Sequence, residues 1–137
     1  MEFPTAEHWM MVQKALLFKD YEMAREMLAV KEATSKTMAK VKALGRKVQN
    51  FDEKVWVAER KRIVREGNKH KFEQNAELRE KLLGTEERHL VEASPRDRIW
   101  GVGFGAQNAP KNRARWGLNL LGEALVEVRA ALRKCVA

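Results

Sequence analysis

The sequence is short of the residues that build disulfide frameworks and metal sites. It contains one cysteine, Cys135, and a single thiol cannot form a disulfide within the chain. Its three histidines, His8, His70 and His89, lie far apart along the chain, and no cluster of cysteine and histidine has the spacing of a zinc site. The sequence therefore gives no support for a resident metal ion, and we expect the protein to use no cofactor.

Long apolar runs are missing as well. No stretch approaches the roughly 20 apolar residues that a membrane-spanning helix needs, and no signal peptide is recognisable. We therefore expect a soluble monomer in the cytoplasm or another intracellular compartment, with no membrane partner. Of the 137 residues, 45% are apolar and 34% charged, and there is no internal repeat or low-complexity segment. This composition predicts one globular domain over residues 1–137.

Acidic residues are outnumbered, with 19 Asp and Glu against 27 Lys and Arg, which gives a net charge of +8. An excess of positive charge favours an anionic partner, either nucleic acid or a phosphorylated small molecule. A generally solvated basic surface is the other interpretation, because the basic residues are spread through the chain and form no long run.

Capping residues, glycines and apolar spacing predict a mainly helical chain. The last helix has the clearest pattern, since apolar residues recur in it at spacings of three and four. We expect this stripe, formed by Leu118, Leu121, Leu125, Val128 and Leu132, to pack on the core and to make this helix the most buried one. The predicted helices run from Thr5 to about Phe18, Asp20 to Leu28, Ser35 to Gly45, Asp52 to Gly67, Lys69 to Gly84 and about Leu118 to Lys134.

The stretch from Ser94 to Gly105, SPRDRIWGVGFG, combines a carboxylate, a tryptophan and three alternating glycines. It follows a short apolar run, His89 to Ala93, which predicts a strand, with Leu90 to Glu92 in a small antiparallel sheet. A strand that leads into a glycine-rich loop lets the backbone approach a ligand closely. Alternatively, Ser94 to Asp97 has the N-cap, N1 proline and N3 acid of a helix start. The predicted fold class is thus mainly α, a single multihelical domain with a minor β element.

The predicted first helix carries a second group of polar side chains. Glu7 falls in its first turn, where the helix dipole alone favours an acid. Glu7, Met11 and Lys14 share one helical face, and Lys14 lies about 10 Å along the axis from Glu7, at about 1.5 Å per residue. That separation lets a carboxylate address a sugar carbon while an ammonium reaches a phosphate, although solvent-facing side chains are the more usual explanation of such a pair.

Several short blocks of the sequence form a recognisable set. They are Pro4 to His8 (PTAEH), Gln13-Lys14, Leu44 to Arg46 (LGR), Trp56, Lys71 to Gln74 (KFEQ), Leu90 to Glu92 (LVE), Asp97 to Gly101 (DRIWG) and Asn119 to Gly122 (NLLG). Taken together, these blocks resemble the NADAR (YbiA-like) N-glycosidase superfamily. They occur in the family's order, with similar spacing, and cover nearly the whole chain. Family members usually carry some tens of residues ahead of the first block, whereas this sequence begins three residues before it. We expect either a short form of the family or a fragment.

The resemblance implies a YbiA-like fold and cleavage of an N-glycosidic bond between a phosphorylated ribose and a base. Two substrate classes follow from it: ADP-ribose attached to guanine in nucleic acid, and phosphoribosylated intermediates of riboflavin synthesis. We expect the first, reversal of guanine ADP-ribosylation, because a domain with a charge of +8 gains more from a polyanion than from a small phosphosugar. A non-catalytic module that binds ADP-ribose or nucleic acid is the remaining alternative.

The resemblance also implies roles for three residues, with Glu7 and Asp97 as the catalytic acids and Trp56 as the aromatic. Cleavage builds positive charge on the ribose, which a nearby carboxylate stabilises. A second carboxyl group can activate water or protonate the departing base. The indole of Trp56 offers a face for a base, although a tryptophan on a helix more often belongs to the core.

Four further residues complete the expected site. We expect Trp100 and Gly101 to shape the wall of the substrate pocket, with Gly101 allowing close backbone approach. Arg46 and Lys14 are candidates for phosphate contact, although Arg46 also fits a helix end. Lys14 permits a second mechanism besides direct hydrolysis, because a lysine of lowered pKa can capture a ring-opened ribose as a Schiff base.

Overall fold

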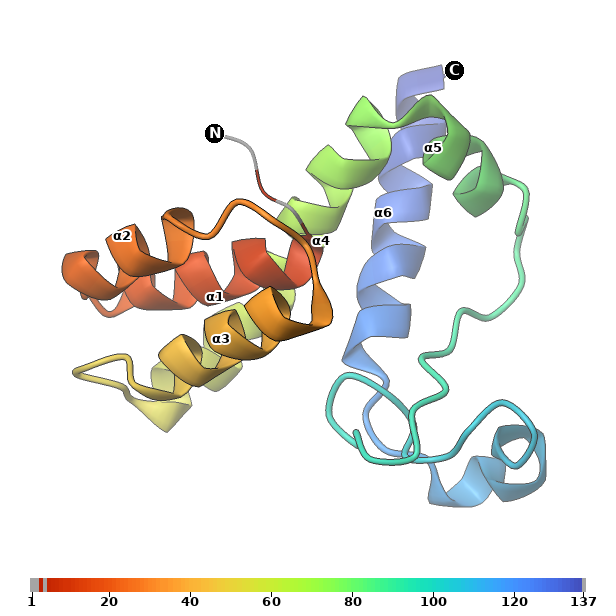
Figure 1. Cartoon of the computed structure of the whole chain (residues 1–137). Coiled ribbons are helices and arrows are strands. Elements are labelled where there is room, and N and C mark those ends of the chain that lie inside the picture. Colours follow the sequence, from red (N-terminus) through yellow and green to blue (C-terminus); the bar gives the residue numbers. More distant parts are fainter. Residues whose placement is uncertain (1–2, 4, 137) are drawn as a thin grey trace. The chain divides into compact units, whose positions relative to one another are not determined.

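A computed structural model describes residues 3 and 5–136 of the chain. Pro4, from the first family block, and the Cys135 side chain lie outside the description. The chain divides into two compact units, residues 1–67 and residues 68–137, and each unit is taken here by itself. The helices, coloured along the chain in Figure 1, are α1 (Ala6–Leu17), α2 (Tyr21–Leu28), α3 (Ser35–Arg46), α4 (Glu53–Gln74), α5 (Ala76–Leu83), the 3-10 helix η1 (Ala109–Arg115) and α6 (Leu120–Val136).

The mainly helical fold class is confirmed, and so are the starts of the first two helices. The Thr5 hydroxyl accepts the amide of His8 at 3.0 Å, and Asp20 Oδ1 accepts the amide of Met23 at 3.2 Å. Each bond satisfies one of the amides that a helix N-terminus leaves without a partner. Whether residues 1–137 form one domain stays a prediction.

The start and end predicted for the third helix are both wrong. Thr34, not Ser35, is the N-cap of α3, because its hydroxyl accepts the amide of Thr37 while the Thr37 hydroxyl accepts the amide of Thr34. The helix also continues through Gly45 to Arg46. Gly45 lies against α1, where a Cβ atom would overlap the sulfur of Met11. The glycine permits close helix packing and does not end the helix.

Gly67 misled the prediction of the fourth helix in the same way. α4 runs through it to Gln74, and α5 begins at Ala76 instead of at Lys69. A Cβ atom on Gly67 would overlap the ring of Trp9, whose Nε1 donates to the carbonyl of Ile63 at 3.0 Å. An indole of α1 thus lies directly on the backbone of α4.

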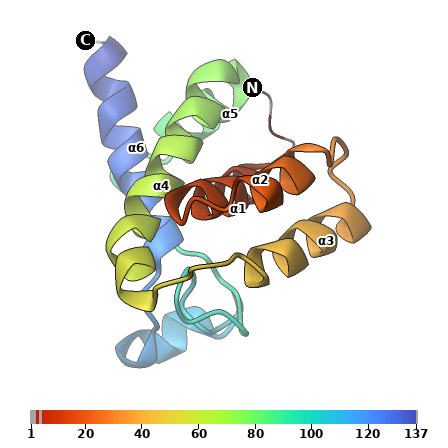
Figure 2. The same ribbon diagram turned by 90° about the vertical axis from the view of Figure 1, so that its left-hand side faces the viewer.

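The core of the first unit lies where α1 packs on α2 and α3, which are drawn side by side in Figure 2. Its buried residues are Val12, Ala15, Phe18, Ala24, Met27 and Val48. His8 joins the first two helices, because its Nε2 donates to the carbonyl of Met27 at 2.6 Å in a buried position. The histidine of the first family block therefore has a structural role in α1–α2 packing.

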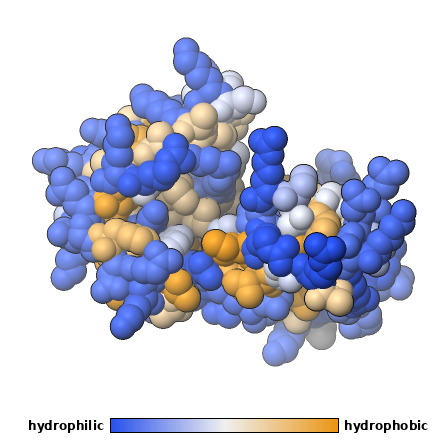
Figure 3. All heavy atoms as spheres, turned by 90° about the horizontal axis from the view of Figure 1, so that it is seen from below, coloured by the Kyte–Doolittle hydropathy of each residue, from blue (hydrophilic) through white to orange (hydrophobic). Residues whose placement is uncertain are grey.

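The second unit is built on the apolar face of α6. Val128 and Leu132 are buried with Leu82 of α5, and Leu125 packs against them, which confirms this part of the predicted stripe. Leu118 is not part of it, because α6 begins at Leu120 and Leu118 is 55% exposed. Over the face drawn in Figure 3, hydrophilic side chains predominate, with smaller apolar groups showing between them.

The predicted strand from His89 to Ala93 is wrong, since no strand forms within residues 3 and 5–136. The backbone of this segment is satisfied differently. The Asn119 side chain accepts the amide of Glu92 at 3.0 Å and donates to the carbonyl of Leu90 at 2.9 Å. The Glu92 carbonyl accepts the amide of Val102 at 3.0 Å. A side-chain amide thus replaces the partner strand that an extended segment otherwise needs.

In the same described part of the chain, no helix has the length and apolarity to cross a membrane.

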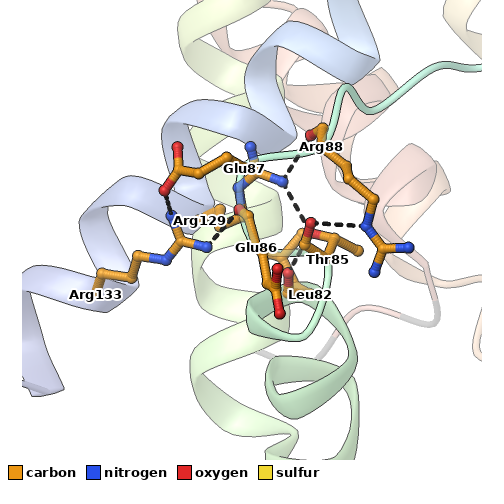
Figure 4. Close-up of polar contacts among 7 residues, drawn as sticks. All are labelled: Leu82, Thr85, Glu86, Glu87, Arg88, Arg129 and Arg133. Carbon is orange, nitrogen blue, oxygen red and sulfur yellow. Dashed lines mark hydrogen bonds and ion pairs between the residues drawn. The ribbon is translucent and has the colours of Figure 1, made fainter.

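A buried arginine fixes the turn that follows α5, as Figure 4 shows. Arg129 of α6 is 4% exposed, and its Nη1 donates to the Thr85 hydroxyl at 2.8 Å and to the Arg88 carbonyl at 2.9 Å. One turn later, Arg133 donates to the Glu87 carboxylate at 2.8 Å and to the Glu86 carbonyl. Local sequence patterns do not indicate this network, because the hydrogen-bonded residues are 41 to 47 residues apart in the chain.

These two arginines form a matched pair for a stability test. Replacing Arg129 with alanine is expected to lower the free energy of unfolding by about 2–4 kcal/mol, because buried hydrogen bonds from a charged donor are lost. Arg133→Ala removes a more exposed set of contacts and is expected to cost about 1 kcal/mol or less. Urea denaturation followed by helical circular dichroism measures both. Equal costs would contradict the assignment of Arg129 as the main brace, and a single transition is expected if the chain folds as one domain.

Candidate functional site

The first unit brings together an acid and two basic side chains from neighbouring helices. Glu7 and Lys14 both project from α1, as the shared-face prediction requires. Glu7 Oε1 lies 3.3 Å from the Nζ of Lys42 on α3, and the Glu7 side chain is 40% exposed. The acid is therefore accessible and paired with a cation that the sequence analysis missed. One sequence feature points to Lys42: it lies one helical turn before Arg46, so both project from the same side of α3.

Lys14 lies against two aromatic rings. Its Nζ is 4.8 Å from the centroid of Phe51 and 5.5 Å from that of Trp56, distances at which an ammonium is attracted by the ring faces. Phe51 was not among the predicted site residues, and it sits in the loop before α4 with its ring edge against the buried Phe18. The two rings together cover the Lys14 amine.

This environment changes the acidity of Lys14. Burial lowers the pKa of its ammonium group, the nearby carboxylate of Glu53 partly opposes that shift, and the positive charge of Arg46 adds to it. A lower pKa means that a larger fraction of the side chain is the neutral amine at a given pH. The neutral amine is the form that attacks a carbonyl or imine carbon.

Trp56 and Arg46 are the other predicted site residues near this amine. Trp56 is partly buried and packs against the core of the first unit, so the structural alternative considered for it holds in part. Its ring nevertheless contacts Lys14. Arg46 is the last residue of α3 and is exposed, close enough for its charge to act on Lys14. Glu7, Lys14, Arg46 and Trp56 thus all lie in the first unit.

Asp97, Trp100 and Gly101 lie in the second unit, in a loop between α5 and η1. Asp97 Oδ1 accepts the amides of Ile99 at 3.0 Å and Trp100 at 2.8 Å, so the carboxylate closes a turn. The alternative that Ser94 to Asp97 starts a helix is wrong, because no helix forms here. Trp100 is partly buried, next to the turn.

Gly101 is needed by the loop itself. A Cβ atom there would lie 2.7 Å from the Glu92 carbonyl oxygen and 2.9 Å from that of Asp97. The close approach that the sequence predicted is therefore to the protein's own backbone. The segment before α6 braces the loop, with the amide of Asn119 donating to the Gly101 carbonyl at 3.1 Å.

Metal-binding groups do not gather near these residues. Within the described part of the chain, no three side chains of His, Cys, Asp or Glu come close enough to hold a metal ion. The first unit instead offers an accessible carboxylate, a covered amine and an exposed guanidinium. These groups can bind an anion. They can also transfer a proton, or attack a carbon that carries developing positive charge.

Comparison with known proteins places these residues in a wider context. A family model described as the NADAR domain matches residues 1–133. An N-glycosidase of Acanthamoeba polyphaga mimivirus is 42% identical over 132 residues, covering 93% of this chain and 74% of the relative. Protein irg-1 of Caenorhabditis elegans is 38% identical over 136 residues, covering 96% of this chain and 62% of the relative.

A bacterial relative extends the comparison. N-glycosidase YbiA of Escherichia coli K12 is 32% identical over 130 residues, covering 95% of this chain and 71% of the relative. One family model thus accounts for nearly all of the sequence, and the relatives from a virus, an animal and a bacterium match it over almost its full length. On this evidence, the chain belongs to the NADAR domain family.

Proposed function

We propose that this protein is an N-glycosidase that hydrolyses the bond between a phosphorylated ribose and a nucleobase amine. The observation that carries the proposal is the Lys14 amine, which lies against the rings of Phe51 and Trp56, on the same helix as Glu7, and whose pKa is lowered by burial. The viral and bacterial relatives, both named N-glycosidases, support the reaction class.

Two routes lead to the same products. In direct hydrolysis, Glu7 stabilises the positive charge that builds on the ribose while the base departs and water adds to C1. In the second route, the sugar ring opens to an imine at C1 and the neutral amine of Lys14 adds to that carbon. The base amine then leaves with a proton, and water hydrolyses the lysine imine, which restores the amine. The lowered pKa of Lys14 favours the second route.

The remaining residues are assigned to binding. Arg46 is proposed to meet phosphate, and Trp56 offers the indole face for a base. In the second unit, Asp97 is proposed to act as an acid, and Trp100 and Gly101 are proposed to take part in substrate binding. Two acids, one for the ribose and one for the leaving base, are what this bond cleavage requires.

We propose ADP-ribose on guanine in nucleic acid as the substrate, and a phosphoribosylated intermediate of riboflavin synthesis as the alternative. Both place a phosphorylated ribose on a base amine, so the groups of the first unit do not separate them. The net charge of +8 favours the polyanion. The protein is further proposed to act as an intracellular monomer without a cofactor.

Incubation of the wild-type chain with each substrate tests the proposal. ADP-ribosyl-guanine DNA and the riboflavin-pathway phosphoribosyl amine are supplied separately, and the released sugar is measured by mass spectrometry. We expect release from the DNA, with at least tenfold slower release from the small molecule. Faster release from the small molecule would reverse the choice of substrate, and release from neither would contradict the proposed activity.

A further inference from the structure

Positive charge is concentrated in one segment of the second unit. Residues 93–119 contain five basic residues and one acid, a net charge of +4, which is half of the excess carried by the whole chain. The one acid, Asp97, is engaged with the backbone amides of its own turn. Acidic residues of the segment itself therefore neutralise little of its positive charge.

Two arginines of this segment lie against aromatic rings. The guanidinium of Arg113 lies 5.4 Å from the ring centroid of Trp116, and that of Arg115 lies 5.9 Å from Phe104. Trp116 is itself fixed, because its Nε1 donates to the Ala109 carbonyl at 2.8 Å. A guanidinium stacked on a ring keeps its N–H groups, which point outward in the ring plane, available for an anion.

The charged groups are exposed and follow one another along the segment. We name the four exposed side chains Arg96, Lys111, Arg113 and Arg115 the basic row. Within residues 3 and 5–136, none of the four makes an ion pair with a carboxylate. The fifth basic residue, Arg98, is used internally, since its Nη2 donates to the Arg115 carbonyl at 2.8 Å and helps to fix η1.

We propose that the basic row binds the phosphodiester backbone of nucleic acid, which rests on the proposed function in that it gives a polymeric substrate its own contact surface. Lys111, Arg113 and Arg115 are all carried by η1, at alternate residues. Several cations on one short element suit a polymer that carries a phosphate on every nucleotide better than the compact anion of one small molecule. Arginine is also the cation best suited to phosphate oxygens.

The test uses unmodified oligonucleotides, single-stranded and double-stranded, labelled for fluorescence anisotropy. The wild-type chain is expected to bind both, with log Kd rising with log salt at a slope of at least about 2. The double variant R113Q/R115Q is expected to bind at least tenfold more weakly. Losing two phosphate contacts should lower the salt slope by about 1.4 on single strands and about 1.8 on duplex.

A matched control removes the same charge elsewhere. Lys36 and Lys40 of α3 are exposed lysines, so K36Q/K40Q lowers the net charge equally in the first unit. We expect this variant to bind within about threefold of wild type. If both double variants bind the oligonucleotides equally weakly, net charge alone explains the loss of affinity and the proposal is overturned. Failure of the wild type to bind either oligonucleotide would overturn it too, as would arginine-dependent binding to phosphatidylserine vesicles only.

The result is separable from the proposed activity, because unmodified oligonucleotides need no cleavage. If the chain binds them through the basic row and cleaves neither sugar substrate, the proposed function fails and this inference stands. If the chain cleaves ADP-ribosyl guanosine and the two double variants bind DNA equally, the reverse holds. Helical circular dichroism of each variant confirms that the comparison is between folded proteins.

Discussion

Replacing Glu7 with glutamine is expected to lower turnover of ADP-ribosyl-guanine DNA by about 10²–10⁴-fold, the range typical of an acid–base group. Glutamine has nearly the same shape but lacks the charge that stabilises the ribose in the transition state. The helix should survive, because the N-cap bond from His8 to Thr5 does not involve Glu7. Single-turnover rates and ADP-ribose binding are measured on the same preparation, and binding is expected to change little.

Lys42→Gln is the matched control for this variant. It breaks the same 3.3 Å ion pair but leaves the carboxylate in place. Exposed ion pairs contribute about 0–1 kcal/mol, so neither substitution should alter stability by more than that. We expect Lys42→Gln to retain turnover within about tenfold of wild type. Turnover of Glu7→Gln near the wild-type rate would contradict the role of Glu7, and Asp97 or Lys14 would then be tested first.

The structural role of Asp97 changes how its variants are interpreted. The sequence offered Ser94 to Asp97 as a possible helix start, whereas the Asp97 carboxylate in fact closes a turn at Ile99 and Trp100. Asparagine keeps an oxygen that can accept both amides, but alanine does not. A loss of activity in Asp97→Asn would therefore report on chemistry, and a further loss in Asp97→Ala on the loop.

Sequence patterns predicted what neighbouring residues determine. The caps at Thr5 and Asp20 satisfy amides three residues away, so the starts of α1 and α2 could be predicted locally. Gly45 and Gly67 were misread as helix ends because their role is set by Met11 and Trp9, more than 30 residues distant. A glycine looks the same in sequence whether it ends a helix or makes room for another.

The same limit applies to the site. The shared face of Glu7 and Lys14 followed from helical spacing, which a sequence displays. Their partners Lys42 and Phe51 come from other elements, so only the folded chain shows that the acid is paired and the amine covered. The strand predicted from His89 to Ala93 does not form for a related reason. Asn119, which is 27 residues from Glu92, supplies a hydrogen bond to that segment.

Replacing Lys14 with methionine is expected to abolish both turnover and covalent trapping if the Schiff base forms. Borohydride reduces a lysine imine to a stable amine, so wild-type protein incubated with substrate should carry a sugar adduct on Lys14 by mass spectrometry. Lys14→Arg is the control, because arginine keeps the positive charge near phosphate but does not form the imine. Loss of turnover by at least about 10³-fold in both variants is expected. Near-normal turnover in Lys14→Arg, with no wild-type adduct, would leave direct hydrolysis as the route.

The pH dependence of the wild-type rate should then follow the pKa of Lys14, which burial lowers, Glu53 raises and Arg46 lowers. The neutral amine is the reactive form, so the single-turnover rate rises with pH until that pKa is passed. Arg46→Gln removes a charge that lowers the pKa, and its rising limb should move to higher pH. Glu53→Gln removes a charge that raises the pKa, and its rising limb should move to lower pH. The rates are measured at saturating substrate, so that a lost phosphate contact in Arg46→Gln does not alter the shift of the pH profile. Two shifts in the same direction, or none, would show that the Lys14 amine does not control the rate.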